Sequence, residues 1–139
     1  MQRSILGRLI VAGSLLAASA PALAETPLDM QRALEGEARQ AVPGFAGFSP
    51  TRGEQFFKAR HGSDWSCASC HTGDPRQPGR HAATGKDIGP LAPAANAERF
   101  TAPAKVDKWF RRNCHDVLGR ACTPLEKGDV LAWLLSLGR

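Results

Sequence analysis

The sequence has no internal repeat, no alternating apolar pattern that would pair strands, and, after its first segment, no apolar run long enough to span a bilayer. Its 139 residues leave room for one domain, which excludes large multi-domain enzymes and dinucleotide folds built from two βαβ halves. The charged (22%) and hydrophobic (42%) fractions are ordinary for a globular chain and argue against wholesale disorder. With only four cysteines, the chain can form two disulfides, one metal site or a covalent attachment.

Acidic residues are absent before Glu25, where the chain instead carries Arg3, Arg8 and a short apolar run. The sequence Ala-Leu-Ala at residues 22–24 is a small-residue cleavage site. Together these features predict a secretory signal peptide over residues 1–24. A membrane anchor is the alternative, but the apolar run is too short and no aromatic belt flanks it.

Removal of that segment takes away two arginines and no acid, so the formal net charge falls from +5 to +3. Residues 25–139 are expected to form a single domain in an oxidising compartment, which we interpret as a bacterial periplasm. The small positive charge gives no reason to expect a nucleic-acid partner.

The mature segment predicts an all-α fold of short helices. Helices are expected over residues 26–41, from Pro50 to about 61–62, over 104–118, and after the capping box at residues 123–126. Residues 72–103 are rich in proline and glycine and form a long loop, which compact domains seldom tolerate without something to organise it. So small a core needs disulfides or a bulky apolar ligand.

Cys67, Cys70 and His71 form a C-x-x-C-H motif, the attachment signature of c-type haem. Two thiols three residues apart reach the two vinyl groups of one porphyrin, and the adjoining histidine is then the proximal iron ligand. A thioredoxin-like dithiol would need a βαβ context, which is missing. A zinc site would need two further ligands, and Cys114 and Cys122 lie at an unusual spacing for that role.

Cys114 and Cys122 flank the end of one predicted helix and the start of the next. In an oxidising compartment we expect them to form a disulfide rather than remain as two free thiols. Closing so short a loop contributes about 2–3 kcal/mol in the chain-entropy model.

Methionine, the usual sixth ligand of electron-transfer cytochromes c, is nearly absent. Met1 lies in the predicted signal peptide and Met30 precedes the haem motif, so methionine ligation is not expected. The remaining candidates for the distal ligand are the lysines and four other residues: His61, His81, Asn113 and His115.

A helical wheel of residues 104–118 separates two of these candidates. Trp109, Phe110 and Val117 fall within about 60° of Val106, and Asn113 lies in the middle of that apolar face. An asparagine there needs a polar partner, which is either the iron side of the haem or the backbone at the helix end. His115 falls on the polar side and would bind only if the helix unwound before it.

Several segments carry a family resemblance. They are residues 67–71 (CASCH), 84–93 (TGKDIGPLAP), 99–101 (RFT), 105–114 (KVDKWFRRNC) and 118–124 (LGRACTP). These segments resemble the Sphaeroides haem protein family of small, class I-like monohaem cytochromes c. The resemblance covers most of the chain from about Pro50 onward and implies a small cytochrome c-like fold, with a haem-binding core at about 50–139, wrapped around one covalently attached haem c.

The resemblance also implies a ligand set. In that family, the asparagine immediately before the first disulfide cysteine binds the ferric iron, and that position is Asn113. The family disulfide falls on Cys114 and Cys122. The related cytochrome c double-prime carries histidine at the Asn113 position, so this chain resembles the asparagine-ligated branch. It departs from the family at His115, where asparagine is expected, and this histidine is a potential competitor.

Further roles follow from the same resemblance. The carbonyl of Pro90 is expected to accept the N–H of His71, and Gly53 with Phe57 is expected to mark a helix crossing opposite Trp133. The cations of the long loop that are available to the haem propionates, or else are solvated, are Arg80, Lys86 and Arg99. Trp109 and Phe110 are interpreted as core or haem-wall residues.

The amide oxygen of Asn113 is a hard, weak ligand that suits Fe(III) better than Fe(II). We therefore expect reduction to release it, and the resemblance implies that the ferrous form binds small diatomics such as O2, NO or CO. The expected electron donor is a partner cytochrome, which the family suggests is dihaem, or a membrane electron-transfer protein. Two alternatives stay open: an electron carrier with a permanently six-coordinate haem, and a haem enzyme acting on NO or peroxide through His115 or His81.

Overall fold

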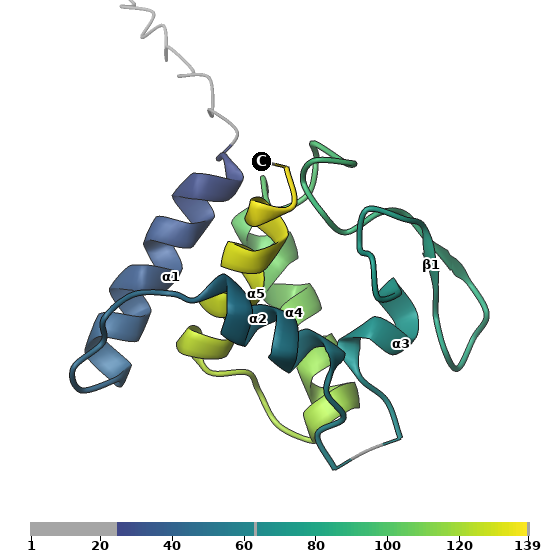
Figure 1. Ribbon diagram of the computed structural model, residues 1–139, viewed down its shortest axis with the longest axis horizontal. Helices are drawn as coiled ribbons and strands as arrows, with labels where there is room; N and C mark the ends of the chain where they lie inside the picture. Colours follow the sequence, from purple (N-terminus) through teal and green to yellow (C-terminus); the bar gives the residue numbers. More distant parts are fainter. Residues whose placement is uncertain (1–24, 63, 139) are drawn as a thin grey trace, which may run out of the picture.

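The computed structural model of this chain describes residues 25–62 and 64–138. The predicted signal peptide, residues 1–24, lies outside the described residues. The described elements are α1 (Pro27–Ala41), α2 (Pro50–Lys58), α3 (Cys67–His71), β1 (Gly79–Arg80), β2 (Asp87–Ile88), α4 (Pro103–Leu118) and α5 (Pro124–Ser136). The predicted all-α class is confirmed (Figure 1).

Helix boundaries follow from local capping chemistry. At the start of α5, the Thr123 hydroxyl accepts from the Glu126 N–H, and the Glu126 carboxylate accepts from the Thr123 N–H at 2.7 Å, so the predicted capping box forms. Helix α4 ends at Leu118, and the next residue, Gly119, adopts the left-handed conformation at φ 70°.

Helix α2 is shorter than predicted, because it ends at Lys58 instead of near residues 61–62. Ala59 is already extended, and the His61 ring turns back so that its Nε2 lies 2.7 Å from the carbonyl oxygen of Phe56. That contact satisfies a carbonyl at the end of the helix without another helical turn.

The crossing of α2 over α5 forms the centre of the protein (Figure 1). A Cβ atom built on Gly53 would lie 1.9 Å from the carbonyl oxygen of Asp129, so the two backbones touch at this point. One turn along, the fully buried Phe57 packs on Trp133 with ring centroids 5.0 Å apart. The predicted glycine–aromatic crossing is therefore confirmed.

A buried carboxylate joins the same two helices. Asp129 is 4% exposed and accepts from Arg52 Nε at 2.7 Å, from Arg52 Nη2 at 2.9 Å and from the Ser49 N–H at 2.7 Å. Both oxygens are thus used, and the charge is paired in a forked geometry. This interaction holds the start of α2 against α5.

Helix α1 packs on α5 through a buried stripe of Met30, Leu34 and Ala38. In Figure 1, α1 and the α3–β1 region lie on opposite sides of the α2–α5 pair. The core therefore sits around α5, whose residues from Gly128 to Leu134 are all buried.

Contrary to the sequence-based expectation, the long loop contains a strand pair. Strands β1 and β2 are antiparallel, with Gly79 opposite Ile88 and Arg80 opposite Asp87. Two-residue strands are too short to show an alternating pattern, so periodicity could not reveal them. The Pro75 carbonyl accepts from both Leu91 N (2.8 Å) and Ala92 N (3.0 Å), which folds the loop back on itself.

We predict that Gly53→Ala lowers the free energy of unfolding by about 1–3 kcal/mol, because its methyl group would force α2 away from α5. Gly36→Ala in α1 is the matched control, since a Cβ there meets nothing within 4 Å. It should raise the free energy of unfolding by up to about 1 kcal/mol. Guanidinium denaturation of the two haem-loaded variants and the wild type measures both changes in the free energy of unfolding. Equal free energies of unfolding for the Gly53→Ala and Gly36→Ala variants would contradict the close crossing of α2 and α5.

Candidate functional site

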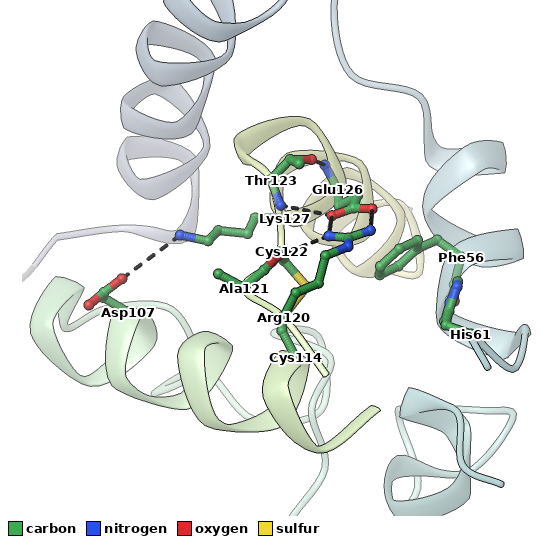
Figure 2. Close-up of a disulfide and its surroundings, with 10 residues drawn as sticks. All are labelled: Phe56, His61, Asp107, Cys114, Arg120, Ala121, Cys122, Thr123, Glu126 and Lys127. Atoms are coloured by element: carbon green, nitrogen blue, oxygen red, sulfur yellow. Dashed lines mark hydrogen bonds and ion pairs between the residues drawn. A yellow bond between two sulfur atoms is a disulfide. The ribbon is translucent and has the colours of Figure 1, made fainter. Parts of the chain in front are cut away.

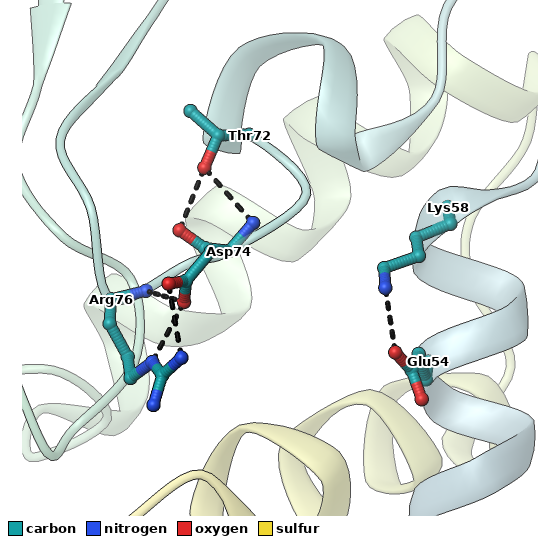
Figure 3. A network of polar contacts seen from close by, with 5 residues as sticks. All are labelled: Glu54, Lys58, Thr72, Asp74 and Arg76. Atoms are coloured by element: carbon teal, nitrogen blue, oxygen red, sulfur yellow. Dashed lines mark hydrogen bonds and ion pairs between the residues drawn. The ribbon is translucent and has the colours of Figure 1, made fainter.

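The C-x-x-C-H motif forms its own short helix, α3, directly after the α2 segment. The Ser66 N–H donates to Ser69 Oγ at 2.9 Å at the start of α3. The helix ends at Thr72, whose φ of 63° reverses the chain. Figure 3 shows the turn that follows: Thr72 Oγ1 donates to the Asp74 carbonyl at 2.7 Å, and the Asp74 carboxylate accepts from Arg76.

The two cysteines of α3 are unpaired and half-buried. Burial raises the pKa of Cys67 to about 11, so its sulfur is a thiol and not a thiolate. A redox-active C-x-x-C pair needs a lowered pKa, which argues against the dithiol alternative. Cys70 Sγ accepts from the Ala82 N–H at 3.2 Å.

His71 is buried enough for its ring to stay neutral. Burial lowers its pKa to about 4, and the positive charge of Arg99 acts in the same direction. A neutral imidazole keeps the nitrogen lone pair that a metal ligand requires. Phe57 lies beside the ring, with centroids 6.2 Å apart.

Gly79 allows β1 to lie directly against α3. A Cβ atom at this position would be 2.0 Å from the Cys70 carbonyl oxygen. No larger residue fits there without displacement of the haem-motif helix. Only its place in a Pro-Gly pair distinguishes this residue in the sequence, and that pair is typical of a turn and not of a contact with α3.

Arg99 holds the loop that contains Pro90. Its Nε donates to the Pro90 carbonyl at 2.8 Å and its Nη2 to the Gly89 carbonyl at 2.7 Å, while Asn96 Nδ2 lies 3.4 Å from the same Pro90 oxygen. A bond from His71 to Pro90 is not among the hydrogen bonds of the described residues, so the proposed role of Pro90 stays a prediction. Nothing in the sequence pattern pointed to Asn96.

The three cations proposed for the propionates differ in their surroundings. Arg80 pairs with Asp87 at 3.2 Å, whereas Lys86 is exposed. Arg99 is half-buried, desolvation lowers its pKa, and no carboxylate lies within salt-bridge distance among the residues that the structure describes. Its guanidinium is therefore the cation that would gain most from a carboxylate partner.

Asn113 lies within α4, five residues before that helix ends, and is half-buried. Gly119 and not Asn113 terminates the helix, and the Asn113 amide makes no side-chain hydrogen bond to any described residue. Val106 and Phe110, on the same face, pack against the edge of the core. The capping and backbone-bonded interpretations of Asn113 are thus without support.

The closely packed helix pairs of the described residues are α2 with α5 and α1 with α5, and α4 belongs to neither. Its apolar face is therefore only partly covered by protein. Trp109 on this helix is 43% exposed, with Lys108 and Arg112 over its ring at 5.9 and 5.3 Å. Trp109 is not a core residue, and its predicted role as a haem wall stays a prediction.

The other candidate ligands are positioned differently. His61 contacts the Phe56 carbonyl, and Nδ1 of His81 accepts from the N–H groups of Ala83 and Thr84, each at 3.3 Å. The His115 side chain is 77% exposed, on the polar side of α4. Met30 is buried in the contact of α1 with α5.

The structure joins Cys114 in α4 to Cys122, two residues before α5, in a disulfide with a Cα–Cα distance of 5.6 Å (Figure 2). Beside it, Arg120 makes a forked pair with Glu126 at 2.7 and 2.8 Å. Both sulfurs are thus consumed, so they cannot join Cys67 and Cys70 in a zinc site. Across residues 25–62 and 64–138, no three His, Cys, Asp or Glu side chains gather as a metal site.

These residues fit one covalently attached haem c. Within residues 25–62 and 64–138, two unpaired thiols and a neutral histidine share α3, the Asn113 amide on α4 has no hydrogen-bond partner, and no other helix closely covers the apolar face of α4. An imidazole nitrogen and an amide oxygen are thus the groups available to an iron between α3 and α4. This arrangement can therefore support electron transfer and ligand exchange at iron.

Comparison with known proteins agrees with this assignment. Residues 43–134 match the family described as a domain of unknown function, DUF1924. The chain is 55% identical over 69 residues to the cytochrome c-type protein SHP of Cereibacter sphaeroides. The matched segment makes up 50% of this chain and spans only 53% of the length of SHP. It is 43% identical over 103 residues to cytochrome c'' of Methylophilus methylotrophus, covering 71% of this chain and 72% of that protein.

Solved structures give the same result. Oxidised cytochrome c'' superposes with a TM-score of 0.73 at 38% identity, over 79% of this chain and 93% of that one. Oxidised SHP, described as an oxygen-binding cytochrome c, superposes with a TM-score of 0.69 at 39% identity, over 81% of this chain and 98% of that one. A solution structure of cytochrome c'', from a study of haem-ligand detachment in that protein, superposes with a TM-score of 0.72 at 37% identity, over 81% of this chain and 94% of that one.

None of the helices in the described part of the chain is long and apolar enough to cross a membrane.

We predict that the double variant Cys114→Ser, Cys122→Ser lowers the free energy of unfolding by about 2–3 kcal/mol, because the disulfide no longer limits the unfolded chain. Guanidinium denaturation of the haem-loaded protein measures this. Wild type treated with a reductant that opens the disulfide is the control and should match the variant. An unchanged unfolding midpoint in both would rule out a stabilising disulfide.

Proposed function

We propose that the distal haem site of this chain opens on reduction to bind a small diatomic. The chain belongs, through its DUF1924 domain, to the family of monohaem c-type cytochromes that includes SHP and cytochrome c''. It therefore carries covalently attached haem c. When bound, the haem supplies a one-electron Fe(III)/Fe(II) couple and an iron that accepts a diatomic ligand. Cys67 and Cys70 would hold it covalently, and His71 would supply the proximal nitrogen ligand.

The observation that carries this proposal is the position of Asn113. Its amide is half-buried on the apolar face of α4, within the helix, and without a hydrogen-bond partner among the described residues. A neutral amide oxygen favours ferric over ferrous iron because it is hard and a weak donor. The Asn113 amide would therefore hold the ferric iron and be released from the ferrous one, which would free its NH2 group to donate a hydrogen bond to a bound diatomic.

The relatives support this mechanism by analogy. SHP is described as oxygen-binding, and the solution study of cytochrome c'' concerns detachment of a haem ligand. We place the protein in the periplasm, with its electron supplied by another cytochrome, one with two haems in the family-based hypothesis, or by a membrane electron-transfer protein. The exposed ring of His115 and the engaged Nδ1 of His81 give little support to an enzyme with a distal acid–base group.

We predict that Asn113→Ala changes the ferric absorption and EPR spectra, because the iron loses its sixth ligand. The ferrous forms of both the wild type and the variant should bind CO, because neither has Asn113 bound to the reduced iron. His115→Ala is the matched control on the same helix and should leave both spectra unchanged.

Two outcomes contradict the proposal. A wild-type ferrous spectrum that is low-spin and insensitive to CO would identify a permanently six-coordinate electron carrier. A ferric spectrum altered by His115→Ala but not by Asn113→Ala would assign the sixth ligand to His115.

A further inference from the structure

The cations of α4 fall into two groups. Arg111 pairs with Asp107 at 3.1 Å, and Lys127 of α5 approaches the same carboxylate at 3.8 Å. Lys105, Lys108 and Arg112 have no carboxylate within salt-bridge distance in the described ranges 25–62 and 64–138, and all three are exposed. The paired cation, Arg111, is also the one that lies farthest around the helix from the other three.

The three unpaired cations lie along one side of α4. They are separated by three and four residues, which places them in one row on a helix. Trp109 lies in the same row, 43% exposed, with Lys108 and Arg112 over its ring. We call these four residues the α4 stripe: Lys105, Lys108, Trp109 and Arg112.

The α4 stripe borders the predicted distal ligand. Trp109 and Asn113 are four residues apart and therefore neighbours on the helix surface. Since Asn113 lies on the apolar face, the stripe forms the solvent-exposed margin of that face. A protein bound to the stripe would thus be close to the haem that Asn113 ligates.

We propose that the α4 stripe is the docking surface for an acidic redox protein that supplies the electron to this cytochrome. Three exposed cations in one row, without internal carboxylate partners among the described residues, attract the carboxylates of an acidic protein. One electron passes from the reduced cofactor of the partner to the ferric iron, which becomes ferrous, and no bond is made or broken between the proteins. This inference rests on the proposed electron-transfer function.

The test uses the haem-loaded protein and, as the probe, an acidic flavodoxin in its hydroquinone form, which is a one-electron donor. Stopped-flow absorption measures the second-order rate constant of haem reduction at low salt. The variant Lys105→Gln, Lys108→Gln should lower that constant about three- to tenfold, because complementary charges steer the encounter. The difference should disappear at high ionic strength, where the Debye length is only about 3 Å.

The matched control is Arg32→Gln, Arg39→Gln on α1, which also removes two exposed positive charges. It should change the rate constant less than twofold. An equal decrease in both double variants would attribute the effect to net charge and overturn the proposal, as would no decrease in the α4 variant.

Two further measurements separate the alternatives. Co-sedimentation with phosphatidylserine vesicles that is lost in the α4 variant, with an unchanged flavodoxin rate, would assign the stripe to an anionic membrane and overturn the proposal. The CO spectrum of the ferrous protein is recorded independently. A selective loss of rate in the α4 variant supports the docking surface even if the ferrous haem does not bind CO.

Discussion

The contact of Gly53 with the Asp129 carbonyl fixes the distance between α2 and α5, and the other elements are placed relative to that pair. Because the two backbones meet without a side chain between them, Phe57 can reach Trp133, and Arg52 can reach the Asp129 carboxylate. Helix α1 covers the outer side of α5. The chain leaving α2 enters α3 only a few residues later, so the haem-motif helix is positioned by the same crossing (Figure 1).

Features that depend on neighbouring residues could be predicted from the sequence. The capping box at Thr123, the helix class and the C-x-x-C-H motif all follow from residues within five positions of one another. The helical wheel also placed Asn113 on the apolar face of α4, because helical periodicity is a local property. The glycine–aromatic crossing at Gly53 is a long-range contact, and it was predictable only through a resemblance to known cytochromes.

Features that depend on distant contacts could not be derived in this way. The end of α2 at Lys58 is set by the return of His61, and the closeness of β1 to α3 depends on Gly79 meeting the Cys70 carbonyl. The strand pair in the long loop is too short to produce a period. Which cations of α4 are unpaired is likewise known only from the contacts in the structure, where Arg111 pairs with Asp107 and a row of unpaired cations remains on one side.

The division of the four cysteines into two local pairs has a consequence for maturation. Haem attachment requires Cys67 and Cys70 to be reduced, while Cys114 and Cys122 must be oxidised in the same compartment. The oxidised pair is only eight residues apart, and a mispaired bridge to α3 would close a loop more than four times longer, at an extra entropic cost of about 1 kcal/mol or more. Spacing therefore favours the Cys114–Cys122 bridge over any bridge from these two cysteines to α3, which leaves the thiols of Cys67 and Cys70 available for the cofactor.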